Sequence, residues 1–360
     1  MLSSYLHASH RAAFIVRAAA WASSGLVIAC GASPPVPTSP TTPTFATSAS
    51  TAAASADSAA NSVANSAAGS ATGSATGSAN SPGAASSPAI FGVPANATAC
   101  GPLGCLQFST AAEAFTYVLD RAKASLGNKG PAVLAIGESH APKGREGIRS
   151  SAQHFAEDLL PLIAPETSDL LLELMLPPSG CEPQRQRVQR SHEPVQQQQS
   201  ASAQSQYVAM GQAARELGVV ADLLRPSCAD LRRIAEADDA VEATLTTIAR
   251  LTTEKVNRLL SPEGRPPRDR DKMIVLYGGV LHNDPDPVQA KRAWSFGADL
   301  KARLQSSYVP VDIFVPEFIG DSATWQALPW YPHYDKNRLG AKATVYHQPD
   351  GQIAIILPRQ

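Results

Sequence analysis

From about residue 100 onward, short apolar runs alternate with amphipathic stretches along the chain. The apolar runs are too short for buried helices and have the length of strands, with flanking stretches that read as helices. Because such strands carry apolar residues on both faces, they favour a parallel sheet that is covered on both sides. The predicted strands are 132–137, 170–176, 219–224, 272–277 and 309–314.

Helical signals fill the intervals between these strands. Thr110-Ala-Ala-Glu113 is a capping box and predicts a helix that ends near Ser125. The polar stretch Glu182–Gln206 follows a strand, so we expect an exposed helix or a mobile loop that is a candidate lid. Further helices are predicted at 148–163, 207–217, 229–260 and 296–304.

The C-terminal residues predict a hairpin. Thr344–Tyr346 and Gln352–Leu357 flank Pro349-Asp350-Gly351, which is typical of a tight turn. Together with the preceding elements, this pattern predicts an α/β fold with a mostly parallel sheet, helices on both faces and a C-terminal β-hairpin. We expect a single domain over 100–360, since about 260 residues suffice for one large core.

Charge is distributed unevenly. Between Ala18 and Ala112 the only charged residue is Asp57, although 17% of the whole chain is charged. The formal net charge of −1 leaves no basic excess, which argues against a nucleic-acid partner. After residue 30 no apolar run approaches the ~20 residues that span a bilayer, which excludes a polytopic membrane protein.

Residues 1–29 have the features of a lipoprotein signal peptide. Arg11 and Arg17 precede an apolar stretch with the length of a secretory signal. Ala29 and Cys30 supply the small residue and the cysteine that lipoprotein cleavage requires, so Cys30 is the predicted lipidation site; the alternative is an ordinary signal peptide with an incidental cysteine. Since Gly31 rather than aspartate follows, we expect an outer-membrane lipoprotein of the cell envelope, held to the membrane by its lipid anchor.

The next segment predicts a tether. Residues 30–95 comprise the cysteine and a stretch rich in Ala, Ser, Thr, Pro and Gly, with the repeat GSATGSATGSAN. Such a composition buries too little apolar surface to offset its ordering entropy, so we expect disorder. A flexible chain of this length has a root-mean-square reach of about 45 Å.

Four further cysteines predict two disulfides in an exported protein. Of the three possible pairings we favour Cys100–Cys105, which closes a tight loop, and Cys181–Cys228, which joins segments that follow predicted strands. A zinc site is the competing interpretation. It is weaker because the chain has no Cys-x-x-Cys pair and no nearby histidine at zinc-ligand spacing.

Ionisable residues follow three of the predicted strands, where α/β sheets bind ligands. Glu138 and His140 are two residues apart and point the same way in an extended segment, so the carboxylate can orient the imidazole for acid–base chemistry. Glu173 interrupts an apolar strand, where an ionised carboxylate is costly unless paired. His282 follows Tyr277-Gly-Gly-Val-Leu. We expect the four groups to lie within about 8 Å of one another.

Less specific interpretations remain open for these residues. A solvated strand end with an incidental histidine would explain Glu138 and His140, and a structural ion pair with an arginine would explain Glu173. Among the other histidines, we expect His154 on a helix surface and His192 in solvent, so neither is assigned to the site.

At these residues the chain resembles the ChaN-like proteins of the erythromycin esterase/TIKI superfamily. The shared pattern is a strand ending in Gly137-Glu138-Ser139-His140, a second strand with Glu173, and a late strand running through glycine to His282. The resemblance covers 132–282. Two departures are that Ala141 replaces a frequent aspartate, and that His282 stands alone where the esterases have two histidines.

The resemblance implies either catalysis or ligand uptake. The first expectation is hydrolysis of an ester or amide in a small molecule or peptide. His140 would act as general base, Glu138 would orient its ring, Glu173 would stabilise the imidazolium, and His282 would protonate the leaving group. His140, Glu173 and His282 are also the candidate ligands of a divalent metal. The alternative is a non-catalytic lipoprotein that binds haem or iron; a tethered scaffold with a vestigial pocket is the third interpretation.

Overall fold

The structure is a computed structural model that describes residues 27–28, 93–335 and 340–360. Val93–Gln360 fall within one compact unit, together with the short N-terminal strand at 27–28. Cys30 and the tether predicted for 30–95, except its last three residues, lie outside the described residues, as does most of the predicted signal peptide.

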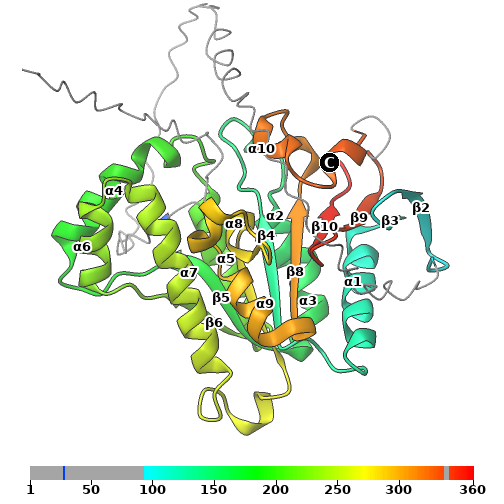
Figure 1. Cartoon of the computed structure of the whole chain (residues 1–360), viewed down its shortest axis with the longest axis horizontal. Coiled ribbons are helices and arrows are strands. Elements are labelled where there is room, and N and C mark those ends of the chain that lie inside the picture. The colour runs from blue at the N-terminus through cyan, green and yellow to red at the C-terminus, as the bar shows by residue number, and fades with distance from the viewer. Residues whose placement is uncertain (1–26, 29–92, 336–339) are drawn as a thin grey trace, which may run out of the picture. The chain divides into compact units, whose positions relative to one another are not determined.

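A mostly parallel sheet forms the centre of the protein and confirms the predicted fold class (Figure 1). Its strand order is β6-β5-β7-β4-β8-β10-β9-β3-β2, and β1 pairs with the end of β5. Pairing is parallel from β6 to β10 and antiparallel beyond it, where β9 and β10 form the predicted hairpin. The strands are β1 (Val27–Ile28), β2 (Ala97–Gly101), β3 (Cys105–Phe108), β4 (Val133–Glu138), β5 (Thr167–Met175), β6 (Val220–Leu224), β7 (Met273–Gly279), β8 (Tyr308–Phe314), β9 (Ala343–His347) and β10 (Ile353–Ile356).

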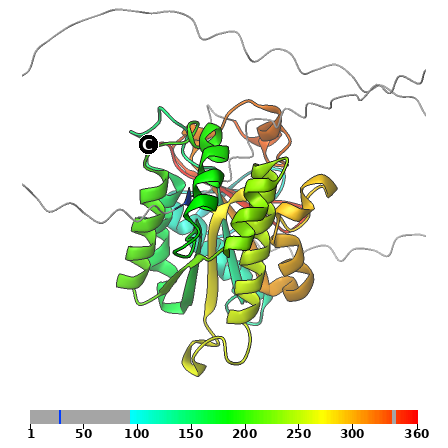
Figure 2. The same ribbon diagram turned by 90° about the vertical axis from the view of Figure 1, so that its left-hand side faces the viewer.

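Helices cover both faces of the sheet, as Figure 2 shows with the sheet seen between two helical layers. One core cluster packs α1 (Ala111–Ser125), α2 (Ser151–His154), α3 (Leu160–Ile163) and α5 (Ala203–Glu216) on the first face. A second cluster packs α4 (Glu182–Gln196), α6 (Cys228–Glu236), α7 (Ala240–Leu259) and α9 (Gly297–Leu304) on the other face. The short helices α8 (Val280–Asn283) and α10 (Ala323–Gln326) follow β7 and β8.

Side-chain caps explain where several helices begin. The capping box of α1 is present, since Thr110 Oγ1 accepts a hydrogen bond from the Glu113 N–H at 3.1 Å. The helix predicted from 148 begins only at Ser151, because Ser150 caps it with a second such box. It then contains a π-helical turn, Phe155–Leu159, that ends next to Pro161, whose nitrogen cannot donate to the helical ladder.

One predicted helix needs correction. The continuous helix predicted over 229–260 is two helices, because Asp239 accepts hydrogen bonds from the N–H groups of Val241 and Glu242 and so caps a new helix, α7. The stretch Glu182–Gln206, expected as an exposed helix or a mobile loop, contains α4 and the start of α5, so the helical alternative is correct.

Two histidines are buried that were expected at the surface. His192 is 1% exposed and its Nε2 lies 2.8 Å from Thr244 Oγ1, and burial lowers its pKa to about 4. His154 is also buried, with Nδ1 2.9 Å from Asp158. The prediction for His192 failed because the residue lies where α4 meets α7, which the composition of its own stretch does not reveal.

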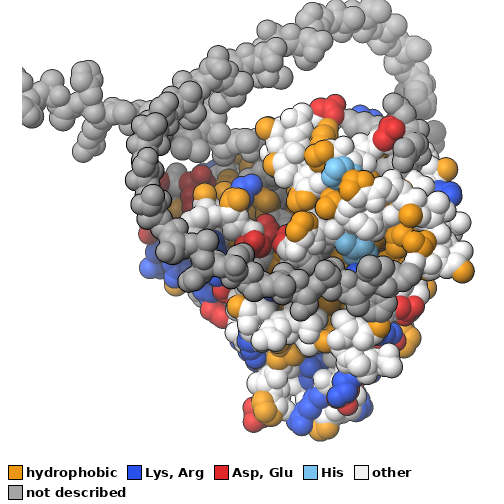
Figure 3. Space-filling view, turned by 45° about the vertical axis from the view of Figure 1, so that its right-hand side comes forward, with side chains coloured by type: hydrophobic (Ala, Val, Ile, Leu, Met, Phe, Trp, Pro, Cys, Tyr) orange, Lys and Arg blue, Asp and Glu red, His pale blue; other side chains and the backbone are white. Residues whose placement is uncertain are grey.

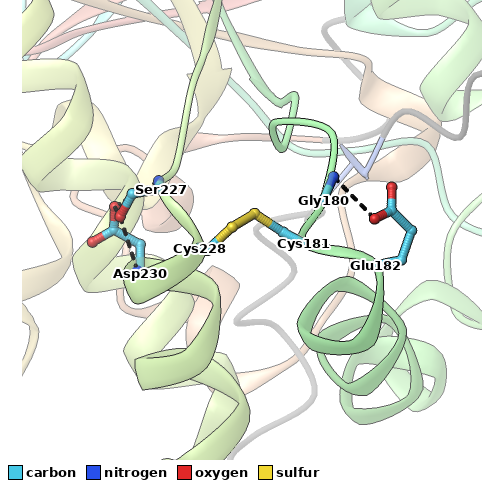
Figure 4. The surroundings of a disulfide bond; sticks show 6 residues. All are labelled: Gly180, Cys181, Glu182, Ser227, Cys228 and Asp230. Atoms are coloured by element: carbon cyan, nitrogen blue, oxygen red, sulfur yellow. Dashed lines mark hydrogen bonds between the residues drawn. A yellow bond between two sulfur atoms is a disulfide. The ribbon is translucent and has the colours of Figure 1, made fainter.

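Both predicted disulfides are present. Cys100–Cys105 links β2 to β3, a hairpin that the sequence patterns did not predict, with Cα atoms 5.1 Å apart. Cys181–Cys228 joins the residue before α4 to the first residue of α6, with Cα atoms 5.4 Å apart (Figure 4). In Figure 4 the Ser227–Asp230 capping box lies directly beside this bond.

The described surface is mixed in character. Acidic, basic and hydrophobic side chains are interspersed on the face that Figure 3 shows. No helix within the described ranges combines the length and apolar character needed to cross a membrane.

Candidate functional site

The four predicted site residues lie at the carboxyl edge of the parallel strands. Glu138 is the last residue of β4, and His140 follows two residues later. Glu173 lies near the end of β5, and His282 lies in α8 directly after β7. Their side chains are between 0% and 6% exposed. They form two His–Glu pairs.

The first pair joins Glu138 to His140. His140 Nδ1 lies 2.8 Å from Glu138 Oε1, as the two-residue spacing predicted. The same carboxylate accepts hydrogen bonds from two tyrosines, Tyr207 on α5 at 3.0 Å and Tyr277 on β7 at 2.7 Å. Glu138 is therefore an acceptor with three donors, and it fixes the ring of His140 rather than contacting a substrate itself.

The two phenols remain donors at any ordinary pH. Burial, followed by the charge of Glu138, raises the pKa of Tyr207 and of Tyr277 well above the usual value of 10.0. The ring of Tyr277 packs against Phe155, with centroids 4.9 Å apart. Phe155 begins the π-helical turn, so this turn supports the donor that holds Glu138.

The pKa of His140 is raised. Burial alone would lower it, but the hydrogen bond and charge of Glu138, with a further contribution from the charge of Glu173, outweigh burial. The imidazole is thus a stronger base than a free histidine, and its Nδ1 proton is directed at Glu138.

The second pair joins Glu173 to His282. Glu173 Oε2 accepts a hydrogen bond from the N–H of Gly279 at 2.6 Å, and its Oε1 lies 3.3 Å from His282 Nε2. A Cβ on Gly278 would come within 2.2 Å of Glu173 Oε2, so the glycine leaves room for the carboxylate. This is why a charged residue can occupy an apolar strand here.

The second pair must share a proton. His282 Nδ1 lies 2.5 Å from the carbonyl oxygen of Trp294, so Nδ1 is the donor in that contact. Nε2 then faces the carboxylate oxygen Oε1, and among the described residues neither atom has a well-aligned hydrogen-bond partner. Two lone pairs repel at this distance, so a proton on Nε2 is required. Burial would lower the pKa of His282, but Glu173 outweighs burial and raises it.

The two pairs lie on opposite faces of the sheet and meet at its edge. Alternation along β4 puts Glu138 on the same face as Leu134 and Ile136, which pack against α1 and α5. Alternation along β5 puts Glu173 on the face of Leu171 and Met175, which pack beneath α7. The charges still interact, since protonated His140 opposes protonation of His282. The four residues therefore form one electrostatically coupled site.

A buried amide–carboxyl contact supports the segment that carries His282. Asn283 Nδ2 donates to Asp312 Oδ1 at 3.0 Å, and the Tyr308 hydroxyl donates to the Asn283 carbonyl at 2.7 Å. A Cβ on Gly137 would lie 2.3 Å from Asp312 Oδ1, so this contact packs directly against β4 one residue before Glu138. Burial raises the pKa of Asp312 to about 8.

The connector between α4 and α5 holds the loop after His140. The N–H of Ser200 donates to the carbonyl of Ala141 at 2.9 Å, and the N–H of Lys143 donates to that of Gln198 at 3.0 Å. The stretch considered as a candidate lid thus contacts the site through backbone hydrogen bonds, from a position next to His140.

The side chains present do not fit the divalent metal that was one expectation. In the described part of the chain, no group of three or more His, Cys, Asp or Glu side chains could hold a metal ion. Glu173 Oε1 and His282 Nε2 face each other, but Nε2 carries the shared proton and His140 Nδ1 is directed at Glu138, so neither ring nitrogen is a metal donor.

Four residues of the site escaped the sequence analysis. Tyr207 lies in a predicted helix and Tyr277 in an apolar strand, where no sequence pattern indicates a polar role, and none singles out Asn283. Asp312 interrupts the apolar run Tyr308–Phe314 in the same way as Glu173 interrupts its own strand. That signal was available and would have found it.

The chain matches no protein-family model, no curated protein and no solved structure. The resemblance to ChaN-like proteins therefore stays a prediction from short motifs.

Proposed function

We propose that the protein is a hydrolase that cleaves an ester or amide by acid–base chemistry. The observation that carries this proposal is the pairing of two buried histidines with two separate carboxylates at one edge of the sheet. One pair suits a general base and the other a general acid, which are the two roles that hydrolysis requires.

His140 acts as the base in its neutral form. Its Nε2 takes a proton from a water molecule while the water oxygen attacks the carbonyl carbon of the substrate. Glu138 accepts the Nδ1 proton throughout, so it keeps the tautomer fixed and stabilises the imidazolium that forms. Tyr207 and Tyr277 hold the carboxylate in place for this role.

His282 acts as the acid in its protonated form. Its Nε2 gives a proton to the leaving oxygen or nitrogen as the bond to the carbonyl carbon breaks, which yields a carboxylic acid and an alcohol or amine. Glu173 stabilises the protonated ring beforehand. Exchange with solvent then returns a proton to His282 and removes one from His140, which completes the cycle.

Haem or iron binding, the alternative from the resemblance, has less support at this site. Tyr207 and Tyr277 are the tyrosines next to the two pairs, and both donate their hydroxyl hydrogen to Glu138. A phenol engaged in this way and held protonated by burial is a poor iron ligand.

The test is turnover of chromogenic esters and aryl amides by the full chain, compared with His140→Asn. We expect the substitution to lower turnover by about 100-fold or more, as is typical when a positioned base is lost. His333→Asn is the matched control because His333 is exposed in a separate loop. Equal turnover by the parent and His140→Asn, or no turnover of any ester or amide by the parent, would overturn the proposal.

A further inference from the structure

The end of β5 has an edge that the rest of the sheet does not cover. The ladder between β7 and β5 ends at Leu172, opposite Tyr277, whereas β7 itself continues beside β4 to Gly279 before α8 begins. On its other side β5 stays paired with β6 up to Met175 and beyond. Leu174 and Met175, one and two residues beyond Glu173, thus lie past the last pair between β5 and β7.

A segment of the chain itself occupies this edge. Val27 and Ile28 form β1, which runs parallel to β5 with Val27 opposite Leu174 and Ile28 opposite Met175. Leu174 and Met175 are each 1% exposed, and buried backbone groups need hydrogen-bond partners. A Val-Ile dipeptide suits this role because β-branched residues favour extended strands.

This occupant belongs to the segment that the sequence predicts to be removed. Cleavage before Cys30 would take Val27 and Ile28 with it and leave the edge open. An open strand edge is a template for pairing with another extended chain. Met175 pairs with β6 on one side of β5, so β1 occupies the other side, which is the side of β7. The incoming end of an added strand would therefore lie next to Gly279, whose N–H is bonded to Glu173.

We propose that the edge at Leu174 and Met175 binds an extended peptide as an added parallel strand. The peptide bond that precedes the residue opposite Leu174 then lies next to Glu173 and His282. This inference rests on the proposed function and gives it a substrate class, an extended peptide with β-branched residues at the two paired positions. Backbone pairing supplies the recognition, so side-chain specificity is secondary.

The test measures binding of a labelled peptide, Lys-Gly-Leu-Val-Ile-Ala-Lys, by fluorescence anisotropy. The parent full chain is compared with Ile28→Pro, and both carry Cys30→Ala so that cleavage cannot remove residues 27 and 28. Proline cannot donate a ladder hydrogen bond, so this substitution weakens the internal occupant. We expect about tenfold tighter binding or more to the variant, because its edge is open in a larger fraction of molecules. The matched control is the same peptide N-methylated at its valine and isoleucine, which removes the donors and should abolish binding.

Equal binding of the peptide to the parent and to Ile28→Pro would overturn the proposal, as would equal binding of the methylated peptide. Binding is measured without turnover, so the two proposals fail separately. If the peptide binds as expected but neither it nor any ester or amide is cleaved, the docking proposal stands and the hydrolase proposal is refuted.

Discussion

Glu173 Oε1 and His282 Nε2 face each other across 3.3 Å inside the protein, with the opposite ring nitrogen of His282 committed to the carbonyl of Trp294. The ring can therefore satisfy both neighbours only as an imidazolium. The protonated ring is buried and is stabilised by one carboxylate. The protonation state of His282 therefore reports directly on its pairing with Glu173.

Replacing Glu173 by glutamine should lower the pKa of His282. Burial lowers this pKa and the carboxylate is what raises it, so loss of the carboxylate should shift the pKa down. Titration of the ring by nuclear magnetic resonance measures it. Glu157→Gln is the control, because Glu157 is 58% exposed in a surface pair with Arg149. An unchanged pKa in Glu173→Gln would refute the shared proton.

The same pair makes folding stability depend on pH. The pKa of His282 is raised above the ordinary value of 6.5, so the folded protein binds the proton more tightly than the unfolded chain does. Its contribution to the free energy of unfolding is complete below pH 6.5 and declines as pH rises through the folded-state pKa. Glu173→Gln should remove this part of the decline in denaturant unfolding measured from pH 6 upward.

Replacing Glu138 by glutamine should move the acidic limb of the pH–rate profile to lower pH. The base form of His140 is the neutral ring, so rates rise as pH passes its raised pKa, and Glu138 is what raises it. Turnover should fall as well, because the ring loses its orienting partner. Tyr277→Phe removes one donor from Glu138 and keeps its charge, so the limb should move far less. A limb that stays in place in Glu138→Gln would show that His140 is not the base.

The sequence predicted the strands of the parallel sheet well because each is a short, largely apolar run. Glu173 was found since it interrupts such a run, and Glu138 with His140 since a strand's two-residue period puts both on one side. Tyr207 was missed for a different reason. It comes from a helix 69 residues away from Glu138 in the chain, and only packing of α5 on the sheet brings its hydroxyl to the carboxylate. Likewise no local pattern indicated that β1 would pair with β5.

Removing the Cys181–Cys228 disulfide should destabilise the protein. Its loop spans 47 residues, and closing such a loop is worth about 4 kcal/mol of chain entropy. The double variant Cys181→Ser/Cys228→Ser should lose free energy of unfolding on this scale in denaturant titrations. Cys100→Ser/Cys105→Ser is the comparison, since a separation of five residues gives a smaller loss. An equal or larger loss in the short-loop variant would contradict the entropic account.

Cys30→Ala should abolish lipidation. The thiol of Cys30 is the predicted acceptor of the lipid, and the peptidase that cleaves before it needs this cysteine. We expect no incorporation of radiolabelled palmitate and a precursor that stays uncleaved, while Gly31→Ala, a neighbouring change that keeps the thiol, should be labelled normally. Equal labelling of Cys30→Ala and the parent would refute the anchor.

Substitutions at Asp312 test whether its hydrogen bond with Asn283, the residue after His282, joins two neutral groups. Burial raises its pKa to about 8, and the charges of Asp284 and Asp350 add to this. At pH 7 the carboxyl is then largely protonated, so Asp312→Asn should keep an acceptor for Asn283 and change stability little. Asp312→Ala removes the acceptor and should cost about 1–3 kcal/mol, the penalty for a buried donor left without a partner.

The pH dependence gives this prediction its sign. A carboxyl whose folded-state pKa is above the ordinary 3.8 binds a proton more tightly when folded, so it reduces stability as pH rises from about 4 to about 8. Asp312→Asn should remove this slope, which is at most about 1.4 kcal/mol per pH unit for one proton. Asp299→Asn, at a residue that is 67% exposed, should leave the slope unchanged. Identical slopes in Asp312→Asn and the parent would mean that Asp312 is ionised in the fold, and the contact with Asn283 would then be a charged one.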